Sequence, residues 1–319
     1  MIRFIDWFAG IGGFRHGLER ANKGSSTENL AKTIKRGCET PAQQEAGNTR
    51  RQSLKRLDGN TDRFFTCVGS CEIDKYARRV YARNFGHEPE WADSRAVDPA
   101  ELPDFDLFCA GFPCQSFSVA GKRLGMSDPR GNLFFEIARI CERKRPSYLL
   151  LENVPGLLSA EDGLAFETIL RKLDEIGYDV QWGCLNSKDY GVPQNRLRLF
   201  LVGHLRGVSR FQVFPLREDD NGDCQLEITT KSTIGAIEAR GAGEYHVGMQ
   251  LIEEYNMAIR RLTPLECERL QGFPNGWTEG VSDTQRYKML GNAVTTTVIE
   301  AIGKRLLEEL ARVPMPMGV

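Results

Sequence analysis

The residues best suited to chemistry in this 319-residue chain begin with Cys114, in the stretch FCAGFPCQSFS (residues 108–118). A proline precedes this cysteine and small polar residues follow it, which suits a thiol offered to a ligand better than a buried structural cysteine. A thiol attacks as its thiolate, and a free cysteine has a pKa of about 8.5. The chain has four histidines and none is close to Cys114 in sequence, so a protease-like Cys–His pair is not expected. A soft thiolate is instead suited to addition to an electron-poor ring.

An acid and two arginines elsewhere in the chain fit the same chemistry. Glu152 ends the apolar run SYLLLE, and an acid opposite the thiolate would stabilise charge on a ring nitrogen. Arg196 and Arg198 are two positions apart, which in a strand places both side chains on one face. One of them would then hold a ring carbonyl. Simple exposure on the surface is the alternative for both arginines.

A glycine turn near the N-terminus predicts a second ligand site. Gly10, Gly12 and Gly13 follow a strand-like run, so the backbone can approach a ligand, and the start of the next helix favours a carboxylate or phosphate. The turn lacks the G-x-G-x-x-G spacing, which disfavours a dinucleotide and a nicotinamide oxidoreductase. Glu72, at the end of another strand-like run, is suited to the two hydroxyls of a ribose. Together they favour a nucleoside ligand that carries a carboxylate, although a solvated acid is the alternative for Glu72 alone.

The segments that must position these residues alternate between strand and helix patterns. Apolar runs cover residues 3–8, 65–72, 105–113 and 147–154, and helical spacing covers residues 132–144 and 164–178. This alternation is typical of an α/β fold with a mainly parallel sheet. Because ligands bind beyond the carboxyl ends of parallel strands, we expect the four strand ends to line one crevice.

Composition limits the remaining classes of function. The net charge is −1, so any contact with a nucleic acid must come from local basic clusters. No apolar run approaches the roughly 20 residues of a membrane span. The N-terminus lacks the pattern of a secretory signal, so we expect a cytoplasmic, nucleoid-associated protein. Nine cysteines without a C-x-x-C pair predict reduced thiols and no metal site.

Three segments are expected along the chain. Residues 1–206 form a catalytic and cofactor-binding domain, with a polar insertion at about residues 22–62. Residues 207–259 are weakly patterned and form a short target-recognition region. Residues 260–319 return to the catalytic domain and include an amphipathic helix near the end.

Taken in order, the motifs of this chain resemble those of DNA (cytosine-5) methyltransferases that use S-adenosyl-L-methionine. The motifs are DWFAGIGGFRHGL, GSCEIDKYARRVYARNFG, WADSRAVDP, CAGFPCQSFSVAGKRLGMSDPRGNLFFEI, LLLENVPGL, DYGVPQNRLRLFLVG, RRLTPLECERLQGFPNGW and MLGNAVTTTV. The resemblance covers most of the chain and implies a Rossmann-like methyltransferase sheet with a small target-recognition domain, which is reduced here. The segment near residues 22–62 is usually short in this family.

The resemblance also implies a role for each matched residue. Cys114 is the nucleophile that adds to C6 of cytosine, Glu152 holds N3 and the exocyclic amine, Arg198 holds O2, and Arg196 supports the site. The cofactor-binding set is Phe8, Gly10, Ile11, Gly12, Gly13, Glu72, Ile73, Asp93, Pro113, Leu133, Asn292 and Val294. The DNA-binding set, in a loop that closes over a flipped cytosine, is Gln115, Ser118, Lys122, Arg123 and Arg130.

These roles imply partners and leave alternatives. The expected cofactor is S-adenosyl-L-methionine, with S-adenosyl-L-homocysteine as product, and the expected substrate is double-stranded DNA. A restriction endonuclease is considered as a functional companion, not a physical one, and we expect a monomer without membrane contact. A tRNA cytosine-5 methyltransferase of the same superfamily and an inactive DNA-binding relative are the alternatives.

Overall fold

A six-stranded sheet forms the centre of the molecule, with strands in the order β2-β1-β3-β4-β7-β5. The computed structural model describes residues 1–23, 64–113, 133–208, 212–216, 234–235, 251–253 and 259–312. The strands are β1 (Ile2–Trp7), β2 (Phe65–Cys71), β3 (Leu107–Gly111), β4 (Tyr148–Asn153), β5 (Tyr178–Asn186) and β7 (Leu197–Leu205). The four runs expected to be strands are therefore confirmed.

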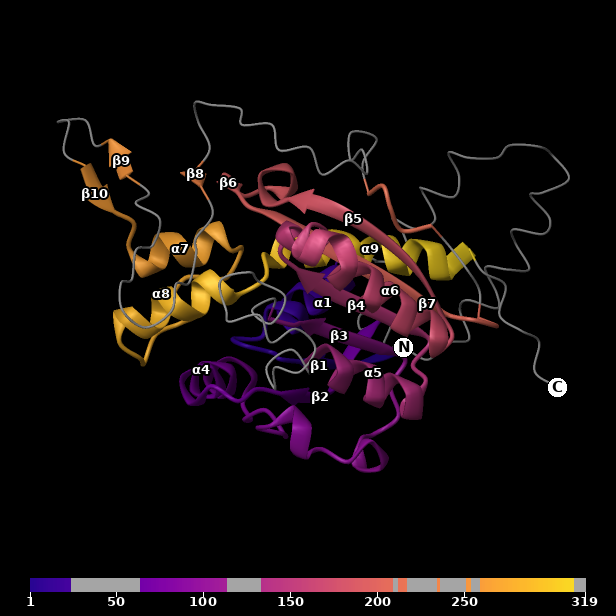
Figure 1. Cartoon of the computed structure of the whole chain (residues 1–319). Helices are drawn as coiled ribbons and strands as arrows, with labels where there is room; N and C mark the ends of the chain where they lie inside the picture. The colour runs from indigo at the N-terminus through magenta and orange to yellow at the C-terminus, as the bar shows by residue number, and fades with distance from the viewer. Residues whose placement is uncertain are drawn as a thin grey trace, which may run out of the picture.

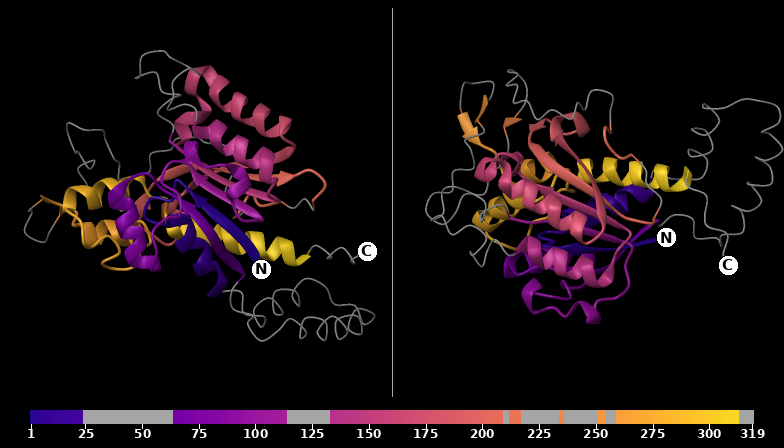
Figure 2. Two further views of the ribbon diagram at one scale, coloured as in Figure 1. Left: turned by 90° about the horizontal axis from the view of Figure 1, so that it is seen from below. Right: turned by 45° about the vertical axis from the view of Figure 1, so that its right-hand side comes forward.

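Helices cover both faces of this sheet. The helices are α1 (Gly13–Lys23), α4 (Lys75–Phe85), α5 (Leu133–Lys144), α6 (Leu164–Glu175), α7 (Pro264–Leu270), α8 (Asp283–Asn292) and α9 (Thr296–Arg312). Figure 2 shows α5 and α6 on one face and α1 and α9 on the other. Short 3-10 helices are η1 (Ser94–Ala96), η2 (Pro99–Glu101), η4 (Pro155–Leu158), η5 (Ala160–Gly163) and η6 (Ser187–Tyr190). The expected α/β class is confirmed.

Strand direction places the candidate residues at one edge. Strands β1, β2, β3 and β4 pair in parallel, so their carboxyl ends lie together. Strand β7 pairs antiparallel to β4, with Glu152 opposite Phe200 and Asn153 opposite Leu199. An antiparallel strand begins where its parallel neighbours end. The start of β7, which carries Arg198, therefore lies at the same edge as Glu152.

Local signals explain where several elements begin and end. The Asp74 carboxylate accepts hydrogen bonds from the N–H groups of Tyr76 and Ala77 at the start of α4. Gly86 follows α4 with a φ of 82°, the left-handed conformation that glycine adopts without a steric penalty. Thr263 and Glu266 form a reciprocal capping box at the start of α7.

The C-terminal residues complete the fold by packing on its N-terminal residues. Helix α9 packs along α1, and α7 and α8 form an end of the molecule beside α4 (Figure 1). Ile11 of the glycine turn joins the apolar cluster formed by these helices, with Val80 of α4 and Leu290 of α8. Small pairs are formed by β9 (Leu251–Glu253) with β10 (Ile259–Arg261), and by β6 (Gln194–Asn195) with β8 (Ile234–Gly235).

The polar insertion begins later than expected, because Asn22 belongs to helix α1. This residue is buried, with its Nδ2 donating to the carbonyl of Phe65 at 3.0 Å. Its Oδ1 accepts from the N–H groups of Phe64 and Phe65 at 3.1 and 2.8 Å. Asn22 therefore joins the end of α1 to the start of β2, and residues 24–62 of the expected insertion lie outside the described residues.

The expectation that the cysteines are reduced is met in part. Cys67, Cys71, Cys109, Cys141 and Cys267 are free, whereas Cys184 on β5 is disulfide-bonded. A disulfide requires close Cβ atoms, which spacing in a sequence does not reveal. None of the described helices is both long and apolar enough to cross a membrane.

Candidate active site

The carboxyl edge of the sheet brings Glu152 close to the strand that leads to Cys114. Gly111, the last residue of β3, pairs with Glu152 of β4. A Cβ atom added at Gly111 would lie 3.3 Å from Glu152 Oε2, so a side chain at this position would press on the Glu152 carboxylate. Beyond Gly111, the carbonyl of Phe112 accepts a hydrogen bond from Asn153 Nδ2 at 3.1 Å. The backbone is thus anchored beside Glu152 just before the exposed Pro113.

Glu152 and Arg198 form a shielded ion pair. Arg198 Nε lies 3.3 Å from Glu152 Oε1, and the two side chains are 16% and 11% exposed. Burial raises the pKa of Glu152, and the nearby Arg198 and Arg196 oppose this shift. A carboxyl group in these surroundings holds a proton to a higher pH than a free glutamate, as a proton donor to a ring nitrogen requires.

Arg196 is positioned differently from the expectation. It lies just before β7 and is only 2% exposed. Its Nη2 donates to the carbonyl oxygens of Gly291 and Ala293, both at 2.9 Å. Arg196 therefore ties the start of β7 to the C-terminal segment that carries Val294. Both guanidinium groups are nevertheless close enough to Glu152 to oppose the effect of burial on its pKa.

The glycine turn follows β1 at the same carboxyl edge of the sheet. Phe8, Gly10 and Gly12 have φ values of 56°, 55° and 85°. A Cβ at Gly12 would approach Phe85 Cε2 to 2.2 Å, and a Cβ at Gly13 would approach Val294 Cγ2 to 2.7 Å. Because both contacts are shorter than any real Cβ contact, glycine is required at these two positions. Val294 thus packs against the turn, as expected.

The Glu72 carboxylate holds the glycine turn by accepting a hydrogen bond from its backbone. Its two carboxylate oxygens accept the N–H groups of Gly10 and Asp74, each at 2.7 Å. Burial raises the pKa of Glu72, and these backbone hydrogen bonds lower it in part. Next to it, Ile73 is 64% exposed. An exposed isoleucine beside a fixed carboxylate offers an apolar surface next to hydrogen-bond acceptors.

The other expected cofactor residues lie in several settings. The Asp93 side chain caps η1 and pairs with Arg95 at 2.7 Å, so it is already engaged with a partner. Leu133 begins α5, and Asn292 ends α8 with an exposed side chain. Cys114, Gln115, Ser118, Lys122, Arg123 and Arg130 lie outside the described residues.

Sequence reasoning missed a buried acid beneath the turn. Asp6 on β1 is fully buried, and its Oδ2 accepts the N–H of Arg15 at 3.3 Å. Burial raises the pKa of Asp6 well above its usual range. The available signal was an acid inside an apolar strand run.

No group of three or more potential metal-ligating side chains occurs in the part of the chain that the structure describes.

Comparison with solved structures defines the fold. The S. pombe Dnmt2 methyltransferase matches 98% of this chain and 100% of its own, with a TM-score of 0.65 and 19% identity. The Entamoeba histolytica methyltransferase EhMeth matches 97% of this chain and 99% of its own, with a TM-score of 0.64 and 18% identity. The chain therefore has the fold of these methyltransferases.

Sequence comparison defines the family. The model for C-5 cytosine-specific DNA methylases matches residues 2–240 and 217–308. Type II methyltransferase M1.ScrFI of Lactococcus lactis subsp. cremoris is 36% identical over 97% of this chain and 79% of its own length. Type II methyltransferase M.HhaI of Haemophilus parahaemolyticus is 32% identical, over 94% of this chain and 93% of its own length. This chain belongs to the C-5 cytosine-specific DNA methylase family and is a DNA (cytosine-5-)-methyltransferase, as its motifs indicated.

Proposed function

We propose that the enzyme transfers the methyl group of S-adenosyl-L-methionine to C5 of a cytosine flipped out of double-stranded DNA, through a covalent bond between Cys114 and C6. One observation carries the proposal. The buried Glu152–Arg198 pair lies beside the strand end that leads to Cys114, at the sheet edge that also holds the glycine turn. This arrangement supports a single site in which Cys114 is the nucleophile, Glu152 is the proton donor and the glycine turn binds a nucleoside.

The residues of the crevice fit S-adenosyl-L-methionine. A Cβ at Gly10 would meet no atom within 4 Å, so open space lies over the turn. The Glu72 oxygens accept the N–H groups of Gly10 and Asp74, and because a carboxylate oxygen can accept more than one hydrogen bond, they are suited to ribose hydroxyls as well. Ile73 supplies an exposed apolar surface for the adenine. When bound, this cofactor supplies a methyl group on a positively charged sulfur.

The described cysteines support Cys114 as the nucleophile. Burial raises the pKa of Cys67, Cys71 and Cys267 to about 12. Burial also raises the pKa of Cys109 and Cys141 above the ordinary range. Since the thiolate is the attacking form, none of these five free thiols is suited to the reaction at neutral pH.

The side chains then divide the work on the cytosine ring. Cys114 Sγ forms a bond to C6, and Glu152 delivers a proton to N3 as electron density moves onto the ring. Arg198 orients Glu152 and binds the ring O2. After C5 gains the methyl group, a base removes the C5 proton, the C6–S bond breaks and N3 returns its proton to Glu152, which restores the ring, the thiolate and the protonated carboxyl group. We take water as this base.

Access to C5 and C6 requires the cytosine to leave the base stack. We propose that residues 115–131 close over the flipped base, with Lys122, Arg123 and Arg130 at phosphates. We also propose a restriction endonuclease as a functional companion, because several relatives are type II methyltransferases.

The test is to express the chain in a host without cytosine methylation and to sequence its DNA and tRNA after bisulfite treatment. We expect C5 methylation confined to one short DNA motif. Methylated tRNA with unmethylated DNA would select the tRNA alternative, and unmethylated DNA and tRNA would contradict the proposal.

Cys114→Ser tests the nucleophile. We expect loss of methylation by at least 100-fold, because a serine hydroxyl is a far weaker nucleophile than a thiolate, with S-adenosyl-L-methionine binding retained. Cys67→Ser, which changes a free thiol on β2, is the matched control and should keep activity. Methylation retained by Cys114→Ser would overturn the assignment.

A further inference from the structure

We propose that Trp277 is a positioning residue for the glycine turn: its indole N–H holds the carbonyl of Ile11 and thereby sets the conformation on which cofactor binding depends. This inference rests on the proposed function, because it concerns the affinity of the turn for S-adenosyl-L-methionine.

The contact joins two buried groups from opposite ends of the chain. Trp277 Nε1 donates to the Ile11 carbonyl at 2.9 Å across 266 residues. Trp277 is 8% exposed and Ile11 is 1% exposed, so water is a poor substitute for either partner. In a regular helix the N–H of Arg15 would reach this carbonyl, but it donates to Asp6 Oδ2 at 3.3 Å. The N–H of Arg15 is engaged with Asp6, so the indole N–H of Trp277 donates to the Ile11 carbonyl in its place.

The indole is held in one orientation. Its ring packs against His16, Phe273 and Phe85, with ring centroids 4.6, 5.1 and 5.6 Å away. Asn84 Nδ2 donates to the Trp277 carbonyl at 2.9 Å.

The residues on both sides of Trp277 are fixed by one carboxylate. The N–H groups of Gly276 and Thr278 donate to Glu268 at 2.6 and 2.8 Å. Glu268 has no exposed surface and also pairs with Arg286 at 3.1 Å. The loop that presents the indole is therefore rigid before any ligand binds, which is the condition for a positioning residue.

The turn has limited support of its own. Gly10 and Gly12 both have positive φ, and glycine has many alternative conformations. Within the turn, the N–H of Gly12 donates to Ala9 at 2.8 Å, and the N–H of Gly10 donates to Glu72. Without the indole donor, the Ile11 peptide would rotate toward another partner and move both glycines out of the binding conformation.

Trp277→Phe is the direct test, because it keeps an aromatic ring and removes the N–H. We expect the Kd and KM for S-adenosyl-L-methionine to rise about 3- to 10-fold, the equivalent of one hydrogen bond, with kcat within about 2-fold of the wild type. Phe273→Leu is the matched control, since Phe273 packs in the same ring cluster but makes no hydrogen bond to the turn through its side chain. It should lower the melting temperature at least as much, with less than a 2-fold change in Kd.

A second measurement needs no ligand. Amide hydrogen exchange of residues 9–14 should be faster in Trp277→Phe than in the wild type or Phe273→Leu. Unchanged exchange and Kd in Trp277→Phe, or equal effects in both variants, would overturn the inference. Failure of the wild type to bind S-adenosyl-L-methionine would instead refute the proposed function, and the exchange rates would still decide the role of Trp277.

Discussion

Glu152 and Glu268 are both buried carboxylates, yet their surroundings move their pKa values in opposite directions. Burial raises the pKa of Glu152, and two arginines oppose it only in part. Burial would also raise the pKa of Glu268, but hydrogen bonds from Thr278, Arg286 and Gly276 outweigh burial and lower it. The number of donors to the carboxylate therefore decides in which direction the pKa of a buried glutamate moves.

Arg198→Met tests this account at Glu152. Because Arg198 stabilises the charged carboxylate, its removal should raise the pKa of Glu152 further above the usual glutamate value. The titration can be followed by carbon-13 NMR of labelled glutamate side chains. Arg206→Met, which removes an exposed guanidinium just beyond the other end of β7, should leave the Glu152 titration unchanged. A pKa that falls in Arg198→Met would contradict the ion pair.

At the scale of elements, Glu268 connects α7 to the loop before α8. Glu268→Gln should lower the free energy of unfolding by about 2–4 kcal/mol at pH 7, since it removes a buried charge that several donors and Arg286 require. The folded-state pKa is lowered, so the wild-type advantage is present above the unfolded pKa of about 4.3. It should be lost as the pH falls through the folded-state pKa.

Urea unfolding from pH 7 to pH 3 measures this difference. Glu279→Gln is the control, because Glu279 pairs with Arg83 on the surface, with both side chains about half exposed. We expect a change below about 1 kcal/mol there. A Glu268→Gln difference that grows as the pH falls would show that the sign is wrong.

The sequence predicted the strands of the sheet more securely than the contacts between residues that are far apart in the chain. Apolar runs that end in functional residues marked β1 to β4, because buried strands must be apolar and ligands bind at their ends. The spacing of Arg196 and Arg198 did not reveal that Arg196 is buried just before β7 and bonded to Gly291 and Ala293. The indole of Trp277 reaches Ile11 across 266 residues, and no local pattern encodes such a contact.

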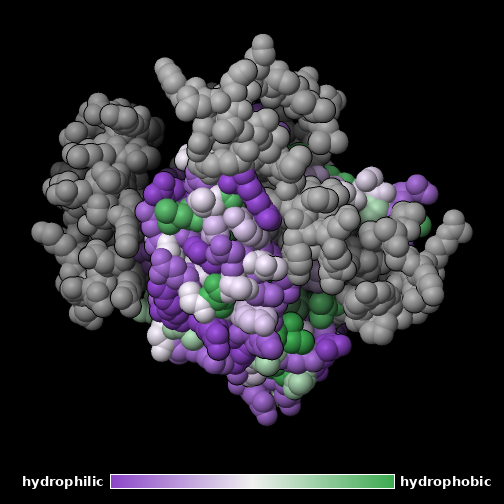
Figure 3. Space-filling model, turned by 90° about the vertical axis from the view of Figure 1, so that its left-hand side faces the viewer, coloured by the Kyte–Doolittle hydropathy of each residue, from purple (hydrophilic) through white to green (hydrophobic). Residues whose placement is uncertain are grey.

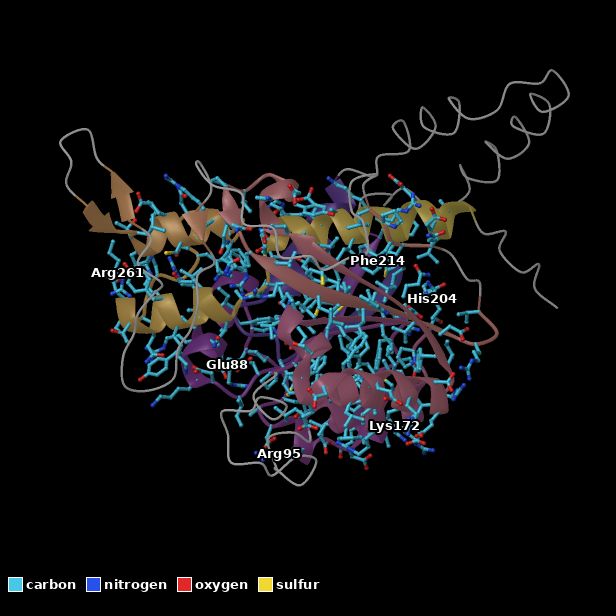
Figure 4. All side chains as sticks on the ribbon, turned by 45° about the horizontal axis from the view of Figure 1, so that its top comes forward. Glu88, Arg95, Lys172, His204, Phe214 and Arg261 are labelled. Atoms are coloured by element: carbon cyan, nitrogen blue, oxygen red, sulfur yellow. The ribbon has the colours of Figure 1, made fainter. Side chains whose placement is uncertain are left out.

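At the scale of the whole molecule, the C-terminal segment contacts both the start of β7 and the glycine turn. Arg196 holds Gly291 and Ala293 beside Val294, while Trp277 holds Ile11. The start of β7 and the glycine turn thus share one segment. At the end of the molecule formed by α7 and α8, the guanidinium carbon of Arg261 lies 4.2 Å from the centre of the Tyr287 ring. Arg261 is on the opposite side of the molecule from His204 of β7 (Figure 4). On the face that shows this end, apolar residues are scattered among hydrophilic ones over the described surface (Figure 3).

The contact between Asn22 and β2 predicts that the polar insertion is dispensable for folding. Asn22 makes three hydrogen bonds to Phe64 and Phe65, which hold the two ends of residues 24–63 together. Replacing these residues with a six-residue Gly/Ser linker should keep the fold and S-adenosyl-L-methionine binding. It should also raise the free energy of unfolding by about 1–2 kcal/mol, because a shorter loop loses less entropy on closure.

Asn22→Ala in the full-length chain is the opposite change at the same junction. It removes a buried side chain that satisfies two N–H groups and one carbonyl, so we expect a loss of about 2–3 kcal/mol. Thermal and urea unfolding with calorimetric titration of the cofactor measure both variants. If the shortened chain unfolds at lower urea or fails to bind S-adenosyl-L-methionine while Asn22→Ala is neutral, residues 24–63 contribute to the fold directly and Asn22 does not close the junction.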